Sequence, residues 1–151
     1  MEYIFDTHAH YDDEAFDEDR ESLIGSLREN GIGNVCNIGA SMESCRTTLA
    51  MAEKYPFFYG ALGIHPNETK DLTEEDMDWL RKASGSEKIV AIGEIGLDYY
   101  WHKEKEEHLL QQKVFRQQMD IAREKKLPFM IHSRDAAEDT LNIVKEYMQD
   151  G

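Results

Sequence analysis

The sequence predicts an α/β fold in which parallel βα units follow one another within a single domain, residues 1–151. Five short apolar runs recur along the chain, and a stretch with helical periodicity follows each of them. The runs show little alternation between apolar and polar residues, which is typical of parallel strands covered on both faces. The distance between the starts of successive runs is that of a βα unit.

The predicted strands are short and rich in apolar residues. They are YIFD (3–6), NVCNIG (34–39), FFYGALG (57–63), KIVAIGEIG (88–96) and PFMIH (128–132). Two architectures fit this pattern. One is an open five-stranded sheet, and the other is about five of the eight units of a closed barrel, which typically needs about 250 residues.

The segments between the strands carry helix signals. Residues 17–30 form an apolar stripe that ends at an Asn-Gly pair, as helices often do. Ser41 is placed to cap the next helix, and Thr73 begins a capping box. The longest helix is predicted over residues 106–126, and a last one over residues 135–149.

Composition and charge restrict the class of protein. The net charge of -14 argues against a surface that binds nucleic acid non-specifically, although bound divalent cations can dominate the field at one site. No apolar run approaches the roughly 20 residues needed to span a bilayer, and no leader pattern opens the chain. Cys36 and Cys45 form neither a disulfide framework nor a metal motif. We therefore expect a cytoplasmic protein without a membrane partner.

Polar residues gather where the predicted strands end. His8 and His10 follow the first strand, His65 the third, Glu94 lies in the GEIG segment of the fourth, and His132 ends the fifth. Because active sites of parallel α/β proteins lie at the carboxyl ends of the strands, we expect these side chains to share one site.

The two amino-terminal histidines suggest a metal. Residues two apart in a strand point the same way, so His8 and His10 would share a face, and Asp6 would orient one of the rings. The alternative is a pair of half-exposed turn histidines without a ligand. Short His patterns occur by chance, so the pair alone leaves both interpretations open.

Glu94 and His132 strengthen the metal hypothesis. Glu94 follows a run that reads as buried, where an unpaired carboxylate costs several kcal/mol, and a bridging role between two cations would remove that cost. Alternatively it pairs with Arg134. His132 alone would more often be a core histidine. With His8 and His10 the set offers N and O ligands suited to Zn, Mn, Ni or Mg.

Other polar residues near the strand ends allow two interpretations each. Arg134 either donates two parallel hydrogen bonds to a phosphate or is a surface arginine paired with Asp135. His65 either binds substrate or shapes a turn before Pro66.

The loop after the fourth strand is also ambiguous. Asp98 and Tyr99 either hydrogen-bond a substrate or anchor the loop, and Trp101 and His102 either meet a base or sugar or serve in packing. His108 falls at a solvated helical spacing, so no role is predicted for it.

Four segments in this order and spacing resemble the TatD family of metal-dependent deoxyribonucleases, which belong to the amidohydrolase-like TIM-barrel hydrolases. The segments are FDTHAHYD, GIHPN, VAIGEIGLDYY and PFMIHSRDA. The resemblance implies a (β/α)₈ barrel with two divalent metal ions that hydrolyses phosphodiester bonds of DNA, often from the 3′ end. It implies that Glu94 bridges the ions, and it assigns His8 and His10 to the first metal, His132 to the second, and His65, Asp98 and Arg134 to the substrate pocket.

The resemblance also implies three further βα units, with another metal-binding histidine and a catalytic aspartate that the 151 residues do not contain. The site of this chain is therefore expected to be incomplete. Three functions stay open: a TatD-type deoxyribonuclease, another amidohydrolase-type hydrolase of an ester, lactone or amide, or an inactive fragment or subunit. Unpaired barrel edges predict self-association.

Overall fold

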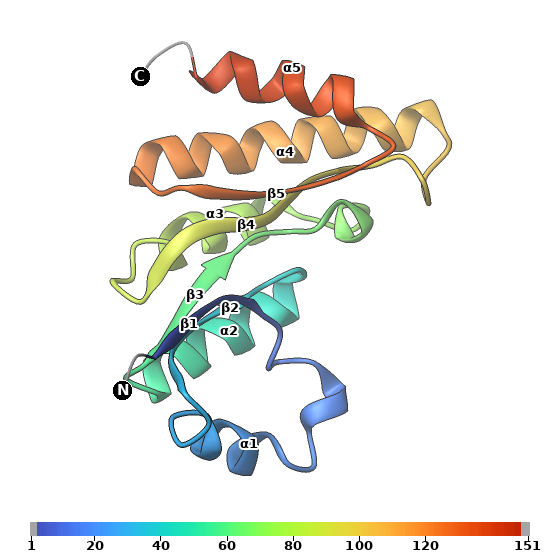
Figure 1. Ribbon diagram of the computed structural model, residues 1–151. Helices are drawn as coiled ribbons and strands as arrows, with labels where there is room; N and C mark the ends of the chain where they lie inside the picture. Colours follow the sequence, from blue (N-terminus) through green and yellow to red (C-terminus); the bar gives the residue numbers. More distant parts are fainter. Residues whose placement is uncertain (1–2, 149–151) are drawn as a thin grey trace.

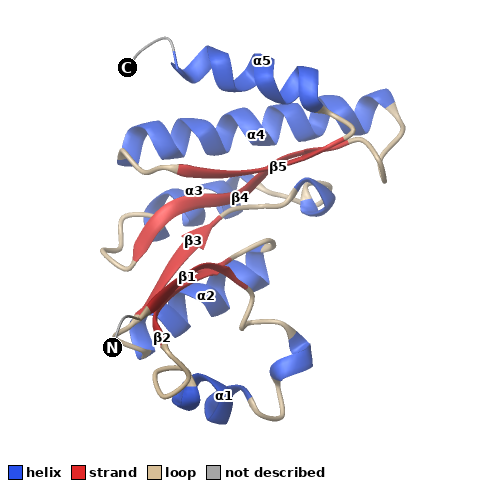
Figure 2. Ribbon diagram, in the orientation of Figure 1, coloured by secondary structure: helices blue, strands red, loops and turns tan. Residues whose placement is uncertain are grey.

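The structure is a computed structural model that describes residues 3–148, and within them five parallel strands form one curved sheet (Figures 1 and 2). The strands stand side by side in chain order: β1 (Ile4–Ala9), β2 (Ile32–Ile38), β3 (Phe58–Leu62), β4 (Ile89–Asp98) and β5 (Phe129–Arg134). A doubly wound sheet reverses its strand order at a switch point. The consecutive order observed here is instead that of a (β/α) barrel, so the predicted α/β fold of parallel units is confirmed.

A helix follows each strand, as predicted. The helices are α1 (Arg20–Ser26), α2 (Met42–Lys54), α3 (Glu74–Ala83), α4 (Lys105–Lys125) and α5 (Ala137–Met148), with short 3₁₀ turns at Glu14–Phe16 and Pro66–Glu68. α2 packs on β2 and β3, α4 packs on β4, and α5 packs on α4 (Figure 1). Across residues 3–148, every helix is too short or too polar to cross a bilayer.

Local chemistry sets two of the helix starts. The hydroxyl of Ser41 accepts a hydrogen bond from the amide of Ser44 at 3.1 Å, and Thr73 forms a reciprocal capping box with Asp76. The first helix is shorter than the predicted 17–30. The Arg20 side chain donates hydrogen bonds to the carbonyls of residues 11, 12 and 13, which holds the preceding segment in a loop.

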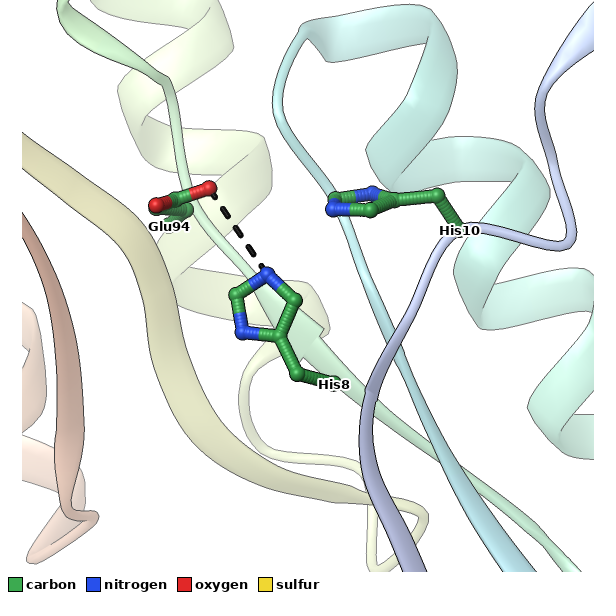
Figure 3. A group of neighbouring side chains, drawn as sticks. All are labelled: His8, His10 and Glu94. Carbon is green, nitrogen blue, oxygen red and sulfur yellow. Dashed lines mark ion pairs between the residues drawn. The ribbon is translucent and has the colours of Figure 1, made fainter.

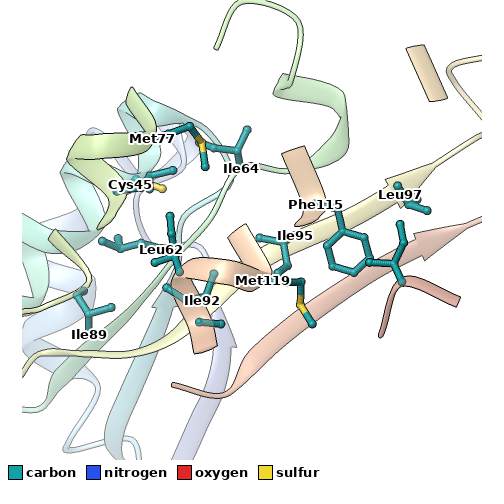
Figure 4. Close-up of a cluster of buried hydrophobic side chains, with 14 of the residues drawn as sticks. Cys45, Leu62, Ile64, Met77, Ile89, Ile92, Ile95, Leu97, Phe115 and Met119 are labelled. Carbon is teal, nitrogen blue, oxygen red and sulfur yellow. The ribbon is translucent and has the colours of Figure 1, made fainter. Parts of the chain in front are cut away.

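The core lies between the centre of the sheet and the helices. Ile95, Phe115 and Met119 are at most 1% exposed and interlock across β4 and α4 (Figure 4). Burying each such side chain contributes roughly 1.5–3 kcal/mol relative to leaving it exposed. This packing fixes β4, which carries Glu94, against the longest helix.

The prediction that all strands are covered on both faces is wrong for β1. β1 is an edge strand that pairs with β2, and its first residues Ile4 and Phe5 are 62% and 48% exposed. The apolar residues of an edge strand look like those of a buried strand in the sequence, because position in the sheet is a tertiary property.

Two strands carry an extra residue where the predicted ligands lie. Three residue steps in β1, from Asp6 to Ala9, lie opposite two steps in β2, from Val35 to Asn37. In the same way β4 has one residue more than β5 between Ile92 and Ile95. Shifts of this kind re-aim side chains and are common beside active sites. His8 and Glu94 both fall in these shifts, so they lie within their strands rather than after them.

Candidate metal centre

β1 and β4 bring three potential ligands together at the carboxyl ends of the strands. His8, His10 and Glu94 each offer one ligand atom, and these atoms lie within 4.8 Å of one another (Figure 3). Nε2 of His8 is 3.9 Å from Oε2 of Glu94, and the rings of His8 and His10 are 5.2 Å apart. Ligands of one ion such as Zn²⁺ lie about 2.0–2.2 Å from it, so a small contraction would bring all three onto one cation.

The second ring nitrogen of His10 is already engaged. Its Nδ1 lies 3.0 Å from the carbonyl oxygen of Ile38, which can only accept a hydrogen bond. The proton of the neutral ring is therefore on Nδ1, and Nε2 keeps a free lone pair for a metal. The sequence assigned this orienting role to Asp6, but its carboxylate accepts from the backbone amide of His8 at 3.3 Å instead.

Glu94 also belongs to a second group, with His65 and His132, whose ligand atoms again lie within 4.8 Å of one another. Oε1 of Glu94 is 3.6 Å from Nδ1 of His132. The side chain of Glu94 is 21% exposed, so it is half-buried rather than fully buried. Its two oxygens thus face histidines from β1 on one side and β5 on the other, which is the arrangement that a bridging carboxylate requires.

Asp98 holds His132 in place. Its carboxylate is 1% exposed; one oxygen lies 3.1 Å from Nε2 of His132, and the other accepts from the amides of Tyr100 and Trp101 at 3.0 and 3.1 Å. Burial would raise the pKa of Asp98, but the hydrogen bonds from Trp101, His132 and Tyr100 outweigh it and hold the pKa below its usual range. The proton of His132 is therefore on Nε2 and the lone pair on Nδ1, toward Glu94. These contacts are those of the loop-anchoring alternative for Asp98, and its predicted contact with substrate stays a prediction.

The tautomer of His65 follows from a hydrogen bond that its ring accepts from the backbone. Its Nδ1 accepts the amide hydrogen of Asn67 at 3.2 Å, which places the proton of the neutral ring on Nε2. Burial, followed by the neighbouring His132, lowers the pKa of His65. A neutral ring with Nε2–H is a hydrogen-bond donor without a free lone pair, so it suits a substrate oxygen better than a metal. Its place beside His132, with ring centroids 4.2 Å apart, agrees with the predicted substrate role.

Arg134 stacks on aromatic rings. Its guanidinium lies 3.9 Å from the centroid of the Tyr100 ring and 5.4 Å from that of Trp101. Among the described residues it forms no ion pair with Glu94 or Asp135, so neither pairing alternative holds. The guanidinium is exposed, and its N–H groups are available to an anion.

The loop after β4 rests on contacts that the sequence did not reveal. His108, which was expected to be solvated, stacks on Tyr99 with centroids 3.6 Å apart and an angle of 14° between the rings. It also contacts the carbonyl of His102 at 2.8 Å. The Tyr99 hydroxyl donates to Asp139, and burial raises the pKa of Tyr99 to about 12. The two ring nitrogens of His102 contact Glu107 and Asn67, at 3.3 and 3.2 Å.

Two buried glutamines on α4 were also missed. Gln111 accepts from the amide of Asp98 at 2.9 Å and donates to its carbonyl, and Gln118 does the same for Ile64. Gln111 thus takes the place of a neighbouring strand as hydrogen-bond partner for the backbone at the end of β4, and Gln118 does so just after β3. The available signal was the spacing of seven residues, which places both glutamines on the buried face of the helix.

The donor set fits hard or borderline divalent cations. Free lone pairs come from imidazole nitrogens and carboxylate oxygens, the ligands that suit Zn, Mn, Ni or Mg. Neither cysteine belongs to the two groups of potential ligands found among the described residues. Burial raises the pKa of Cys36 to about 11 and that of Cys45 to about 12. Both cysteines are free, as expected.

Residues 5–151 match the protein family described as "TatD related DNase". Among curated proteins, the chain is 42% identical over 143 residues to the "Uncharacterized metal-dependent hydrolase YabD" of Bacillus subtilis, covering 95% of the chain and 55% of that protein. It is 32% identical over 133 residues to the "3'-5' ssDNA/RNA exonuclease TatD" of Cronobacter sakazakii, covering 88% of the chain and 50% of that protein.

Solved structures show the same similarity. The crystal structure of YJJV, a TatD homologue from Escherichia coli K12, superposes with a TM-score of 0.83 at 29% identity over 95% of the chain and 56% of that structure. A TatD family hydrolase from Entamoeba histolytica gives a TM-score of 0.85 at 24% identity over 99% of the chain and 56% of that structure, and supports the fold alone. The chain spans about half the length of the curated relatives that it matches.

Proposed function

Because the chain belongs to the TatD-related DNase family, we propose that it holds two divalent cations and serves in the hydrolysis of phosphodiester bonds of DNA. The observation that carries this proposal is the position of Glu94, whose two oxygens face separate groups of histidines. The printed name of the Cronobacter relative, an exonuclease of single-stranded DNA and RNA, supports a nucleic-acid substrate.

The residues of the chain divide into three roles. His8, His10 and Glu94 would hold one ion, and Glu94 and His132 the other; the bound ions would supply Lewis acidity and lower the pKa of coordinated water. His65 would donate Nε2–H to a phosphate oxygen. Arg134 would form two parallel hydrogen bonds to the phosphate. Asp98 would act on the reaction only through His132, by fixing its tautomer.

A substrate panel tests the proposal. The chain and the complete B. subtilis relative are incubated side by side with 3′-labelled single-stranded DNA, a dinucleotide, an ester, a lactone and an amide, with Mg²⁺, Mn²⁺, Zn²⁺ or Ni²⁺ or with EDTA. We expect metal-dependent release of nucleotides from the single-stranded DNA by the complete relative. Hydrolysis of the ester, lactone or amide without cleavage of DNA would favour another amidohydrolase-type reaction. Metal binding by the chain without any hydrolysis would favour an inactive fragment or subunit.

We also expect the chain to self-associate. β1 and β5 are the edges of the sheet, and unpaired edges and exposed apolar residues such as Ile4 and Phe5 favour association. Light scattering should show oligomers, Ile4→Lys should increase the monomer fraction, and the monomer should have little or no DNase activity with Mg²⁺ or Mn²⁺. A monomer that degrades DNA at an ordinary enzymatic rate would contradict this expectation.

Replacing Arg134 by lysine is expected to weaken the binding of the substrate phosphate. Lysine keeps the charge but loses the planar pair of donors, so KM for a DNA end should rise about tenfold, on the order of 1.4 kcal/mol. Metal content should not change, because Arg134 contacts none of the proposed ligands. Steady-state kinetics with elemental analysis measures both quantities, and an unaltered KM would remove Arg134 from the site.

A further inference from the structure

Two large aromatic side chains are exposed beside the metal centre. Tyr100 is 42% exposed and Trp101 is 63% exposed, and their rings meet edge to face with centroids 4.6 Å apart. They lie in the loop that directly follows β4. We call Tyr100, Trp101 and Arg134 the aromatic platform.

The backbone of this platform is held in place. One oxygen of Asp98 accepts from the amides of both Tyr100 and Trp101, and Lys103 donates from Nζ to the carbonyl of Tyr99 at 2.9 Å. A surface that is ordered before it binds loses less entropy on binding. The exposed indole is therefore presented from a fixed backbone position.

Cations accompany the aromatic rings. The guanidinium of Arg134 lies 3.9 Å from the Tyr100 centroid, and Nζ of Lys103 lies 5.3 Å from the same centroid. Pairs of a cation and an aromatic ring also occur elsewhere in the described chain, such as Arg28 with Tyr3, but here two cations approach the same ring, that of Tyr100. Aromatic faces combined with cations are the features that bind single-stranded nucleic acids.

The platform adjoins the proposed metal ligands. Gly96 pairs with His132 and Asp98 with Arg134 across β4 and β5. His132 and Arg134 are two residues apart, so their side chains leave the same face of the strand roughly 7 Å apart, at about 3.3 Å per residue. The same Asp98 carboxylate contacts His132 and the amides of the platform. A ligand with its phosphate at the metal centre would thus extend toward Trp101.

We propose that Trp101, supported by Tyr100 and Arg134, stacks on an unpaired nucleobase of a single-stranded nucleic acid whose phosphate lies at the metal centre. The inference rests on the proposed phosphodiesterase function and assigns a base-binding residue to it. In a duplex both faces of a base are stacked, so a protein aromatic ring gains access only to a strand that is unpaired or opened. Stacking is tolerant of sequence because every base has a π-face.

The chain allows this contact to be observed directly, because it has only two tryptophans. The other, Trp79, lies on α3 with the guanidinium of Arg46 4.4 Å from its ring centroid. The variant Trp79→Phe leaves Trp101 as the single indole. In EDTA, a single-stranded dT oligomer should quench its fluorescence to saturation. The same strand with abasic sites, and a blunt duplex, should quench it much less.

Binding of a labelled dT oligomer gives the second measurement. Trp101→Ala should weaken affinity by about 5- to 150-fold, the range for loss of one stacked base, and Trp101→Phe should restore most of it. Affinity for the abasic strand should not change. Leu141→Ala, which removes another exposed apolar side chain, is the matched control and should bind as the parent does.

The outcomes separate this inference from the proposed function. If Trp101→Ala binds the dT oligomer as tightly as the parent, or the abasic strand quenches equally, the stacking contact is absent even where DNA is cleaved. If no single strand binds with or without Mg²⁺, the inference is also overturned. If stacking is observed but DNA is never cleaved, the platform stands and the phosphodiesterase proposal fails.

Discussion

Replacing Glu94 by alanine is expected to remove most of the metal that the chain binds. Loss of an outer hydrogen-bond partner of a ligand typically costs 10- to 100-fold in metal affinity, so loss of a direct, shared ligand should cost more than about 100-fold. Glu94 faces histidines in both candidate groups, and the variant should therefore lose both ions.

His10→Ala should lower metal content as well. The Ile38 carbonyl engages Nδ1 of His10, so the lone pair of Nε2 is free for a metal, and the variant loses it. Elemental analysis after dialysis, together with calorimetric titration of Mn²⁺ and Zn²⁺, measures the effect. Glu53→Ala, a change of an exposed carboxylate on α2, is the control and should keep the parent metal content. The assignment of the site would be wrong if Glu94→Ala and His10→Ala both retained the parent content.

The second large effect is expected from Gly96→Ala, on stability. Gly96 has φ +143°, a conformation that side chains rarely adopt, and a Cβ there would lie 1.9 Å from the carbonyl oxygen of His132. The clash is with the backbone of β5, which cannot move aside as the end of a side chain can. Strain and overpacking together should cost on the order of 3–5 kcal/mol.

Thermal unfolding followed by circular dichroism measures this cost. For a chain of this size each kcal/mol corresponds to about 2–4 °C, so Tm should fall by roughly 6–20 °C. Gly25→Ala is the matched control, because nothing lies within 4 Å of a Cβ at that position in α1. It should be neutral or slightly stabilising. A Gly96→Ala protein that melts with the parent would show that β4 and β5 separate there without cost.

The sequence predicted the fold because its signals are local. The α/β class follows from alternating apolar runs and helical periods, which fit both an open sheet and a barrel until the strand order was seen. The caps at Ser41 and Thr73 are formed by residues three positions away. The start of α1 was misplaced because the contacts of Arg20 with carbonyls of the preceding loop leave no periodic pattern. The exposure of β1 was missed because an edge strand is defined only by the assembled sheet.

The candidate site was predictable to the level of which residues meet. His8, His10 and Glu94 approach one another because parallel strands end at one edge, and that follows from strand order. The contacts that decide ring tautomers, such as Ile38 with His10 and Asp98 with His132, join positions 28 and 34 residues apart. No single-sequence pattern marks such pairs, so the roles of His65 and Asp98 required the structure.

The Asp98 carboxylate has a consequence for the energetics of the whole site. It accepts hydrogen bonds both from His132 and from the backbone of the loop that carries Trp101, so a well-ordered His132 ring favours a well-ordered loop, and the reverse. When two ligands both stabilise the same group, the binding of one changes the affinity for the other, and the change is equal in both directions. By whatever factor an ion beside His132 tightens the binding of a strand at Trp101, the strand must tighten the ion by the same factor. The chain would hold its cations most firmly when nucleic acid is present.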